Sequence, residues 1–493
     1  MPSRRFITGL SCALLLTIAT ATVRAQSATV RTYNSRNFLM YTDLAADDAR
    51  DLLTRLETML GLISAYWGQP NKQIIEMYVA DDFASWPPQV VAQMDPDGVR
   101  QIRSGAGVTA SVSRISAVSR QTKSKVYAVA DRGTPQHEAV HAYCHQTFGT
   151  SGPLWYSEGM AEMGQYWKKD DASVNCSEIV LRYLKQSEPK SLNEIVNPQT
   201  EFTGDSWQNY AWRWALCHLL ANNTNYAPRF RPLGLGLLTK KNVSFEQVYG
   251  SMSDEIVFEY LEMLKTMEKG YRADLCSWDW SAKFVSPTRS RTLRSTIEAG
   301  RGWQATRAML SKDEEYNYSA SGFWKTAKDA TPVSAAGGED GRGQLLGVIF
   351  SDYQLGEPFE LDAYGTFTAK ADGQLFVRCQ DEWGNIADNS GEIEFLIKEN
   401  DSTRPLPRPD QRQTKSMLAD ANQAEDKTTE PKTESDQPSA SDGAIRKAKS
   451  KLRFGKLLMR SNVAKAREYL KEAVELAPSS DVAKAAQKLL DEL

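Results

Sequence analysis

The pattern of apolar and polar residues predicts two helices and three strands in the first half of the chain. From Ala45 to Trp67, apolar residues recur at helical spacing, and they are Leu52, Leu53, Leu56, Met59, Leu60 and Ile63. From Ser206 to Asn222, a second helical face carries Trp207, Tyr210, Ala211, Trp214, His218 and Ala221. Short apolar runs at 38–42, 74–80 and 125–129 are typical of strands. We therefore expect residues 26–280 to form one α+β domain.

The pattern changes to short alternating runs in the second half of the chain. Residues 281–298 are rich in Ser, Arg and Thr, and we expect them to form a connector. Residues 299–398 alternate between apolar and polar positions, most clearly at 359–363 and 375–379, which predicts an all-β sandwich. Cys379 shares the parity of Leu375 and Val377, so its thiol is expected to be buried.

The C-terminal part combines a polar segment with a short helical one. Residues 399–443 contain almost no large apolar side chains, which predicts a disordered linker. Helical spacing returns in residues 444–493, where Tyr469, Ala473, Leu476 and Pro478 resemble part of a tetratricopeptide repeat. A single repeat buries little surface, so we expect a small helical hairpin that docks on another surface or on a protein partner.

Composition and the N-terminus indicate where the chain works. The formal net charge is −3, without a basic stripe, so the sequence does not indicate nucleic-acid binding. Residues 1–25 have the features of a secretory signal: basic Arg4 and Arg5, an apolar run, and a cleavage site after Ala25. No other apolar run is long enough to span a membrane. We therefore expect an exported protein, periplasmic or extracellular.

Cysteine usage leaves the redox state of the mature chain open. Export permits disulfides. Five cysteines follow the signal, namely Cys144, Cys176, Cys217, Cys276 and Cys379. Because five is odd, at least one must be free or pair between chains, and the first four allow three pairings.

A histidine pair provides the clearest candidate for chemistry. The sequence His137-Glu138-Ala139-Val140-His141 places two imidazoles four residues apart, on one face of a helix. Such a pair can bind one Zn²⁺, with Glu138 as general base for the attacking water. Only 4 histidines occur in 493 residues, so a chance match is rare, although a plain helix with two surface histidines is the alternative. His145 is too far along the helix from His137 to join the same ion.

A second motif follows after sixteen residues and carries a resemblance to a known family. Leu154-Trp155-Tyr156-Ser157-Glu158-Gly159-Met160-Ala161-Glu162 resembles the W-x-x-E-G-x-A-E helix of the gluzincin zinc metallopeptidases. That resemblance implies that Glu158 is the third zinc ligand and that Glu162 is a carboxylate behind His137. The alternative is that both are solvated helix carboxylates. Gly159 favours close helix packing, because a surface helix gains nothing from glycine.

The same resemblance extends to a tyrosine and to a strand. The segment Tyr210-Ala211-Trp212-Arg213-Trp214-Ala215-Leu216 is similar to a helix in secreted bacterial proteins that share the two motifs. Tyr210 resembles the gluzincin tyrosine that stabilises the oxyanion, although it also fits an ordinary core aromatic residue. In that family an edge strand beside the zinc helix pairs with the peptide substrate, and residues 125–129 are expected to supply it. We find no clear counterpart of the aminopeptidase G-x-M-E-N segment.

The end of the predicted sandwich contains an oxygen-rich loop. Asp381, Asn385, Asp388 and Asn389 carry the side-chain oxygens that Ca²⁺ prefers. The loop resembles the calcium loop of the LecA-type galactose-binding lectins, in which the ion also holds sugar hydroxyls. No counterpart of the lectin's sugar-contacting His and Gln can be placed. An Asx-rich turn that closes a hairpin is the alternative.

These observations predict a multidomain exported zinc metallopeptidase. In this hypothesis His137, His141 and Glu158 bind Zn²⁺, Glu138 and Tyr210 act on a peptide or protein substrate, and the sandwich binds calcium or glycans. The alternative is a non-catalytic carbohydrate- or protein-binding protein with a vestigial zinc-peptidase fold. The intact Glu138 favours the enzyme, and the Asp/Asn loop favours carbohydrate binding. The sequence indicates neither the bond that is cleaved nor the oligomeric state.

Overall fold

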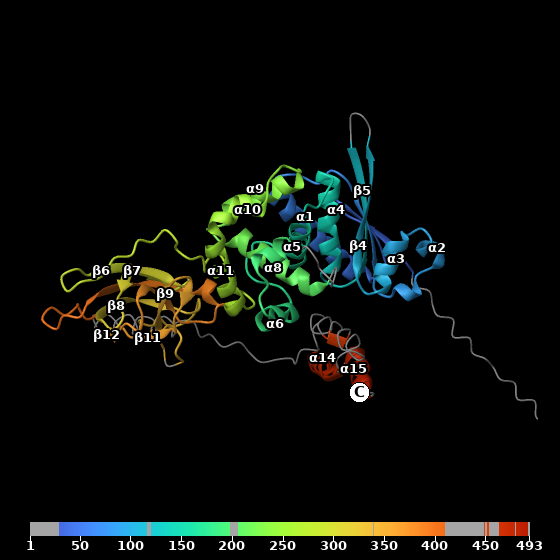
Figure 1. The fold of residues 1–493 in the computed structure, drawn as a ribbon. Coiled ribbons are helices and arrows are strands. Elements are labelled where there is room, and N and C mark those ends of the chain that lie inside the picture. Colours follow the sequence, from blue (N-terminus) through green and yellow to red (C-terminus); the bar gives the residue numbers. More distant parts are fainter. Residues whose placement is uncertain are drawn as a thin grey trace, which may run out of the picture. The chain divides into compact units, whose positions relative to one another are not determined.

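The chain is multidomain and combines helices with several β-sheets (Figure 1). The computed structural model describes residues 29–115, 120–197, 206–338, 340–409, 448, 451–452, 463–478 and 480–491. The predicted signal (1–25) and residues 410–443 of the predicted linker lie outside these ranges. Two compact units divide the chain, Met1–Ala421 and Asn422–Leu493.

A five-stranded mixed sheet forms the first part of the larger unit. Its strands, in spatial order, are β1 (Arg31–Asn34), β2 (Phe38–Thr42), β3 (Ile75–Ala80), β5 (Arg120–Val129) and β4 (Gly107–Ile115). The three central strands β2, β3 and β5 run parallel, whereas β1 and β4 pair antiparallel at the two edges. This arrangement agrees with the predicted α+β character.

One prediction about this sheet is wrong. Residues 125–129 belong to β5, which lies between β3 and β4 and cannot be an edge. The edge of the described sheet beside the histidine helix is β4, which follows the short helix α3 (Pro96–Arg103). Because β4 pairs with β5 over its whole length, it covers the edge of β5 that would otherwise be free.

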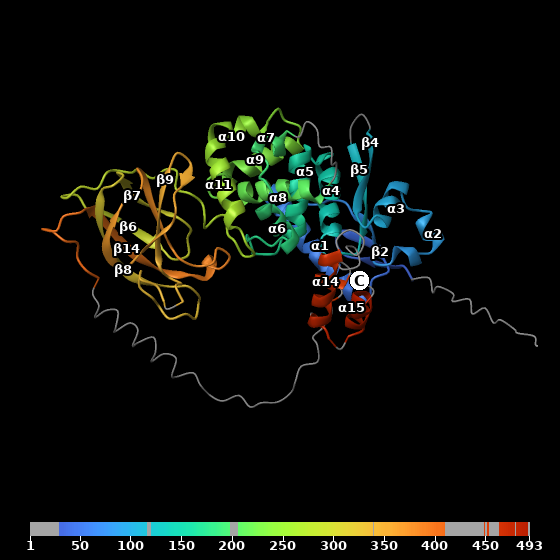
Figure 2. The same ribbon diagram turned by 60° about the horizontal axis from the view of Figure 1, so that its bottom comes forward.

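Helices pack beside the sheet in successive layers. α1 (Ala46–Trp67) buries all six residues of the predicted apolar stripe. α4 (Thr134–Phe148) contacts β5 and β4, α5 (Leu154–Tyr166) contacts α4, and α8 (Trp207–Asn222) contacts α5 (Figures 1 and 2). The other helical segments are η1 (Phe83–Ser85), α2 (Pro88–Val91), α6 (Glu178–Gln186), α7 (Leu192–Val196), α9 (Ala227–Leu238), α10 (Phe245–Tyr249), η2 (Gly250–Met252) and α11 (Ser253–Thr266).

Two antiparallel sheets face each other in the predicted sandwich region. One sheet contains β12 (Tyr364–Thr368), β8 (Glu315–Lys325), β14 (Ser390–Glu399) and β6 (Leu293–Glu298). The other contains β10 (Gln354–Leu355), β9 (Leu345–Ser351), β13 (Gly373–Cys379) and β7 (Gln304–Leu310), with β11 (Phe359–Leu361) beside β9. Cys379 is buried, as its parity predicts.

The predicted connector is too long. Strand β6 lies within residues 281–298 and pairs with β14, so the sandwich begins at Leu293. Its apolar alternation is weak in the sequence, because Ser295 takes the inward position between Leu293 and Ile297. Before it, Val285 forms a bridge with Ala308. Aromatic packing joins the helices to the sandwich, since Phe258 of α11 and Trp278 contact Phe350.

The smaller unit contains a pair of helices, α14 (Val463–Leu476) and α15 (Asp481–Asp491), in contact with each other. Leu470, Ala473 and Ala486 form one of its buried clusters. Its similarity to a tetratricopeptide repeat stays a prediction. None of the helices in the described part of the chain is both long and apolar enough to cross a bilayer. The five cysteines that follow the predicted signal are free thiols in the structure.

Candidate metal centre

The sequence around α4 fixes where the histidine helix begins and ends. The Asp131 carboxylate accepts hydrogen bonds from the backbone N–H groups of Gly133 and Thr134, at 2.9 and 2.6 Å. It therefore satisfies two of the N–H groups that a helix start leaves without partners. Gly149 ends the helix with φ 77°, a left-handed conformation that favours glycine.

Two glycines let α5 approach its neighbours closely. A Cβ added to Gly164 would lie 2.4 Å from Val140 Cγ2 on α4. A Cβ added to Gly159 would lie 2.4 Å from Cys217 Sγ and 2.8 Å from the Arg213 carbonyl oxygen, both on α8. These contacts agree with the close packing expected at Gly159. They position the α5 face that carries Glu158 against the histidines of α4.

The structure brings His137, His141 and Glu158 together. The Nε2 atoms of the two histidines lie 3.2 Å apart. Oε2 of Glu158 lies 3.2 Å from the first Nε2 and 3.4 Å from the second. Within the described residues, this is the group of His, Cys, Asp and Glu side chains able to hold a metal ion. His145 does not belong to this group, as its distance along the helix predicts.

The three ligand atoms fit a single small cation. Tetrahedral coordination with bonds of about 2.1 Å places neighbouring ligand atoms about 3.4 Å apart. The three distances in the cluster have this size. A carboxylate and two imidazole nitrogens are also the donor set of catalytic zinc sites, which leave a further position open. The residues present therefore fit a metal such as zinc.

Electrostatics around the cluster favours positive charge. Burial alone would lower the pKa of His137, but Glu158 and Glu162 outweigh it and hold the pKa well above its ordinary value. Burial would raise the pKa of Glu158, yet its bonds to the two imidazoles hold that pKa far below the usual range. Without a metal, the site attracts protons for the same reason that it would attract a cation.

Two side chains orient the imidazoles from behind. Nδ1 of His137 lies 3.1 Å from Oε1 of Glu162, the carboxylate that the resemblance placed there. Nδ1 of His141 lies 3.3 Å from the Ser157 hydroxyl. A partner on Nδ1 leaves Nε2 with its lone pair toward the cluster, as a metal ligand requires. Sequence reasoning did not identify Ser157, because its role depends on how α5 crosses α4.

Glu138 is buried next to the cluster, with 7% of the residue exposed. Its Oε2 accepts a hydrogen bond of 2.9 Å from the Thr109 hydroxyl on β4. Gly107, on the same strand, comes so close that an added Cβ would lie 2.9 Å from Glu138 Cγ. The sequence marks neither β4 residue as part of the site, because it does not predict that strand.

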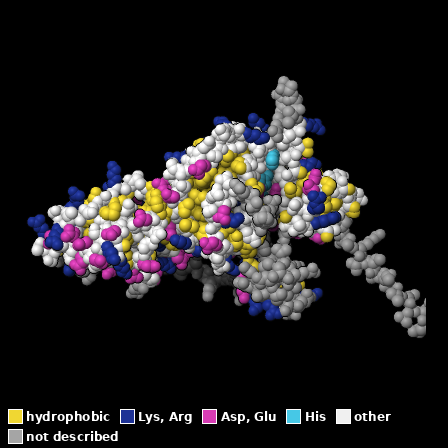
Figure 3. Space-filling model, viewed as in Figure 1, with side chains coloured by type: hydrophobic (Ala, Val, Ile, Leu, Met, Phe, Trp, Pro, Cys, Tyr) yellow, Lys and Arg dark blue, Asp and Glu magenta, His cyan; other side chains and the backbone are white. Residues whose placement is uncertain are grey.

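Tyr210 lies at the same place, on α8. The centres of its ring and the His137 ring are 5.7 Å apart, and Tyr210 is half-buried. This position suits the predicted role without testing it. Figure 3 shows histidine side chains at the surface, next to hydrophobic side chains of the helical part. Of the cluster itself, His137 is buried, whereas His141 and Glu158 are partly exposed.

The four predicted calcium ligands of the loop differ in burial and in their contacts. Asp381 is 6% exposed, and the side chain of Asn389 lies beside it. Among the described residues, Asp381 Oδ2 and Asn389 Oδ1 are buried without a hydrogen-bond partner. Burial raises the pKa of Asp381. Asp388 is exposed, and Asn385 instead donates to Glu382, with 2.9 Å between Nδ2 and Oε2.

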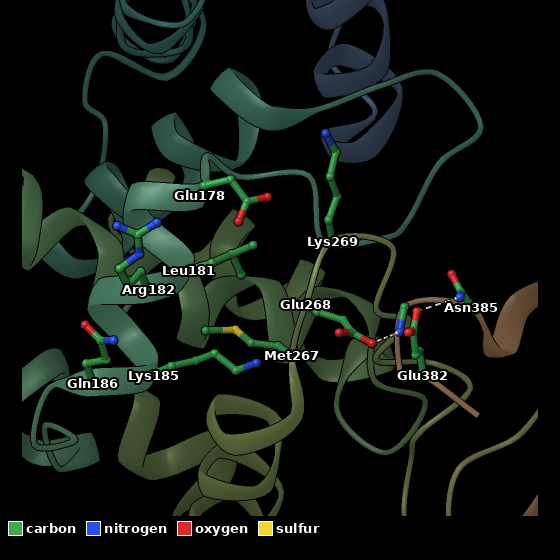
Figure 4. Close-up of a pocket in the computed structure, with 11 residues that line it drawn as sticks. Glu178, Leu181, Arg182, Lys185, Gln186, Met267, Glu268, Lys269, Glu382 and Asn385 are labelled. Carbon is green, nitrogen blue, oxygen red and sulfur yellow. Dashed lines mark hydrogen bonds between the residues drawn. The ribbon is translucent and has the colours of Figure 1, made fainter. Parts of the chain in front are cut away.

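A cavity of about 460 Å³ lies apart from the metal cluster. It is open on one side and is lined by α6, by the segment after α11 and by the loop residues Glu382 and Asn385 (Figure 4). The Gly384 N–H donates to the Glu268 carboxylate at 2.7 Å, where the loop meets the segment after α11. None of the predicted zinc residues lines this cavity.

Comparisons with known proteins do not assign the chain to a family. No protein-family profile matches it, and no curated protein matches it. Several solved structures do match, among them one described as the EclA N-terminal domain, a PllA-like lectin. That match has 17% identity and a TM-score of 0.19, and it covers 22% of this chain and 96% of the lectin domain. This match is a local similarity and assigns no function to this chain.

Proposed function

We propose that this chain is an exported zinc metallopeptidase of the gluzincin type. One observation carries the proposal: Nε2 of His137, Nε2 of His141 and Oε2 of Glu158 lie 3.2–3.4 Å from one another. The spacing of these residues and the Trp155–Glu162 motif resemble that family. The buried carboxylate of Glu138 beside the cluster supports hydrolysis over simple metal storage.

The proposed roles follow from where each side chain lies. His137, His141 and Glu158 would hold the zinc, and Glu162 and Ser157 keep the imidazoles oriented. When bound, zinc supplies a Lewis acid that acidifies water and polarises a carbonyl group. Glu138 accepts the proton of the attacking water and passes it to the leaving amine. Tyr210 donates a hydrogen bond to the negative charge that develops on the carbonyl oxygen.

An extended peptide is the substrate class that the sheet edge favours. β4 is the edge strand of the described sheet, and it lies against α4 beside the cluster. An exposed strand edge can pair with a peptide backbone, which gives affinity with little dependence on side chains. We therefore propose that β4, and not residues 125–129, pairs with the peptide substrate.

Replacement of Glu138 by Gln tests this proposal. The variant keeps the shape of the side chain and should keep its zinc, but it cannot accept a proton. We expect hydrolysis of a peptide library to fall about 100-fold or more. Glu178→Gln, an exposed residue on α6, is the matched control and should leave hydrolysis unchanged. Equal hydrolysis by wild type and Glu138→Gln would reject the assigned base.

We also propose that the loop 381–389 binds Ca²⁺, which supports the alternative function of glycan or protein binding. The observation that favours it is the pair of buried oxygen atoms, Asp381 Oδ2 and Asn389 Oδ1, without partners among the described residues. A cation removes the cost of burying such atoms. The proposed calcium site lies in the sandwich and shares no residue with the proposed zinc site.

Terbium luminescence tests the calcium loop, because Tb³⁺ replaces Ca²⁺ and Trp383 lies within the loop. We expect Trp-sensitised emission that added Ca²⁺ suppresses and that Asp381→Asn removes. Asp401→Asn, after the last strand of the sandwich, is the control. No emission from wild type, or emission unaffected by Asp381→Asn, would contradict the site. A glycan array with and without Ca²⁺ then tests carbohydrate binding.

A further inference from the structure

One threonine contacts the proposed base from the edge strand. Thr109 Oγ1 lies 2.9 Å from Oε2 of Glu138 and 2.8 Å from the main-chain oxygen of the same residue. The hydroxyl has one proton and therefore donates to one of these two oxygens at a time. Both ends of this contact are half-buried or buried, so water competes weakly for it.

The backbone of the same threonine faces the open edge of the sheet. Val129 donates its N–H to the carbonyl oxygen of Ala106, which lies opposite it in the β4–β5 register. In an antiparallel pair, hydrogen-bonded and non-bonded positions alternate. Counting from Ala106, the odd residues of β4 direct their N–H and C=O groups away from β5. Thr109 is one of them, so its backbone points to the edge where a peptide would pair.

We infer that Thr109 is a positioning residue that connects peptide docking along β4 with the orientation of Glu138. The inference rests on the proposed peptidase function. Its backbone would pair with the substrate, and its side chain would hold the base at a fixed distance from that substrate. A peptide seated on the strand is thereby aligned with the carboxylate that must reach the attacking water.

The two acceptors of the Thr109 hydroxyl suit both protonation states of the base. While Glu138 is ionised, the hydroxyl donates to its carboxylate. When Glu138 has taken the proton of water, the hydroxyl turns to the main-chain oxygen of Glu138, and its own oxygen faces the protonated carboxyl group. The proton stays on Glu138 until the leaving amine receives it. Thr109 neither gains nor loses a proton.

The close approach of β4 to α4 explains why a glycine, Gly107, stands two residues before Thr109. A Cβ on Gly107 would lie 2.6 Å from Thr134 Cγ2 and 2.9 Å from Glu138 Cγ. Any side chain there would push the strand away from the helix and lengthen the Thr109 contact. Gly107 and Thr109 share one face of β4, because they are two residues apart.

Thr109→Val and Thr109→Ser test the inference. Valine keeps the shape and the strand backbone but removes the hydroxyl, whereas serine keeps the hydroxyl. We expect Thr109→Val to lower kcat about 10- to 100-fold with KM nearly unchanged, as loss of a hydrogen bond to a charged group implies. Thr109→Ser should recover most of the lost kcat. Thr122→Val on β5 makes the same exchange away from Glu138 and should match wild type.

Two measurements other than activity complete the test. Zinc content of Thr109→Val should equal that of wild type. Its dissociation constant for an uncleavable analogue of a substrate peptide, with a reduced amide in place of the scissile bond, should stay within about twofold of the wild-type value. Wild-type kcat in Thr109→Val, equal losses in the valine and serine variants, or loss of zinc would each overturn the positioning role. If zinc-loaded wild type cleaves no peptide, the proposed function falls, and the inference falls with it.

Discussion

Nδ1 of His137 lies 3.1 Å from Oε1 of Glu162, one helical turn beyond the proposed ligand Glu158. The two carboxylates of α5 therefore act on the same imidazole from opposite ring nitrogens. In the proposed site, Glu158 would share the metal with Nε2, and Glu162 would favour the tautomer with the proton on Nδ1. This relationship explains why the helix needs carboxylates at both positions on one face.

Glu162→Gln should weaken zinc binding without removing a ligand. The amide is a poorer partner for the imidazole N–H, and such partners typically account for 10- to 100-fold in metal affinity. Competition titration with a zinc chelator measures the change. Glu178→Gln serves as the control, since that residue is exposed on α6. Unchanged affinity in Glu162→Gln would show that the contact does not orient His137.

Removal of zinc should destabilise the domain that holds the cluster. A ligand present at about 1,000 times its dissociation constant stabilises the folded state by about 4 kcal/mol. For a domain of this size, that corresponds to a fall in Tm on the order of 10 °C. Differential scanning calorimetry with and without EDTA measures it. The His137→Ala, His141→Ala double variant should not respond to EDTA, and a wild type equally unresponsive would contradict the prediction.

Gly159→Ala should destabilise the protein, because the new methyl group has no room between α5 and α8. Its position 2.4 Å from Cys217 Sγ and 2.8 Å from a backbone oxygen forces the helices apart, at a cost of about 1–3 kcal/mol. The matched control is Gly61→Ala in α1, where nothing lies within 4 Å of the added Cβ. That variant should gain about 0.5–1 kcal/mol. Urea unfolding compares the two, and equal effects would contradict the packing argument.

His218 should make the protein sensitive to acid. Burial lowers the pKa of His218 to about 4, against the opposing effect of Asp274 and Asp171, whereas the unfolded value is about 6.5. The neutral imidazole therefore favours the folded state above pH 6.5. This stability is lost as the pH falls from about 6.5 towards 4, by an amount on the order of 3 kcal/mol.

Urea unfolding of the metal-free protein between pH 7 and pH 4 measures this effect. His218→Gln lacks the titrating group and should lose less stability over that range than wild type. Metal-free protein is needed because acid also releases a metal from His137 and His141. Parallel pH profiles for wild type and His218→Gln would contradict the prediction.

That His137, His141 and Glu158 come together could be predicted from the sequence, the two histidines from local geometry and Glu158 from the gluzincin resemblance. Two histidines four apart on a helix must share a face, and the Trp155–Glu162 motif supplies a carboxylate at a helical position. The sequence does not give the distance between the two helices. That distance depends on Gly159 and Gly164, whose neighbours Cys217, Arg213 and Val140 are known only from the fold.

Other parts of the site could not be predicted because they depend on contacts between distant segments. Thr109 and Glu138 are 29 residues apart, and only the hairpin of β4 and β5 brings them together. β4 does alternate, with Val108, Ala110 and Val112 between hydroxyl residues, but its side chains are small and the strand was overlooked. Residues 125–129 were consequently mistaken for the edge of the sheet.

The most direct test of the central claim is zinc X-ray absorption spectroscopy on purified protein, with zinc stoichiometry from elemental analysis. We predict about one zinc per chain, bound by two imidazole nitrogens and at least one carboxylate oxygen at about 2.0–2.1 Å. His141→Ala should lose the zinc or one imidazole from its shell. A wild-type protein without zinc, or a zinc shell unchanged in His141→Ala, would contradict the metal centre and the peptidase function that depends on it.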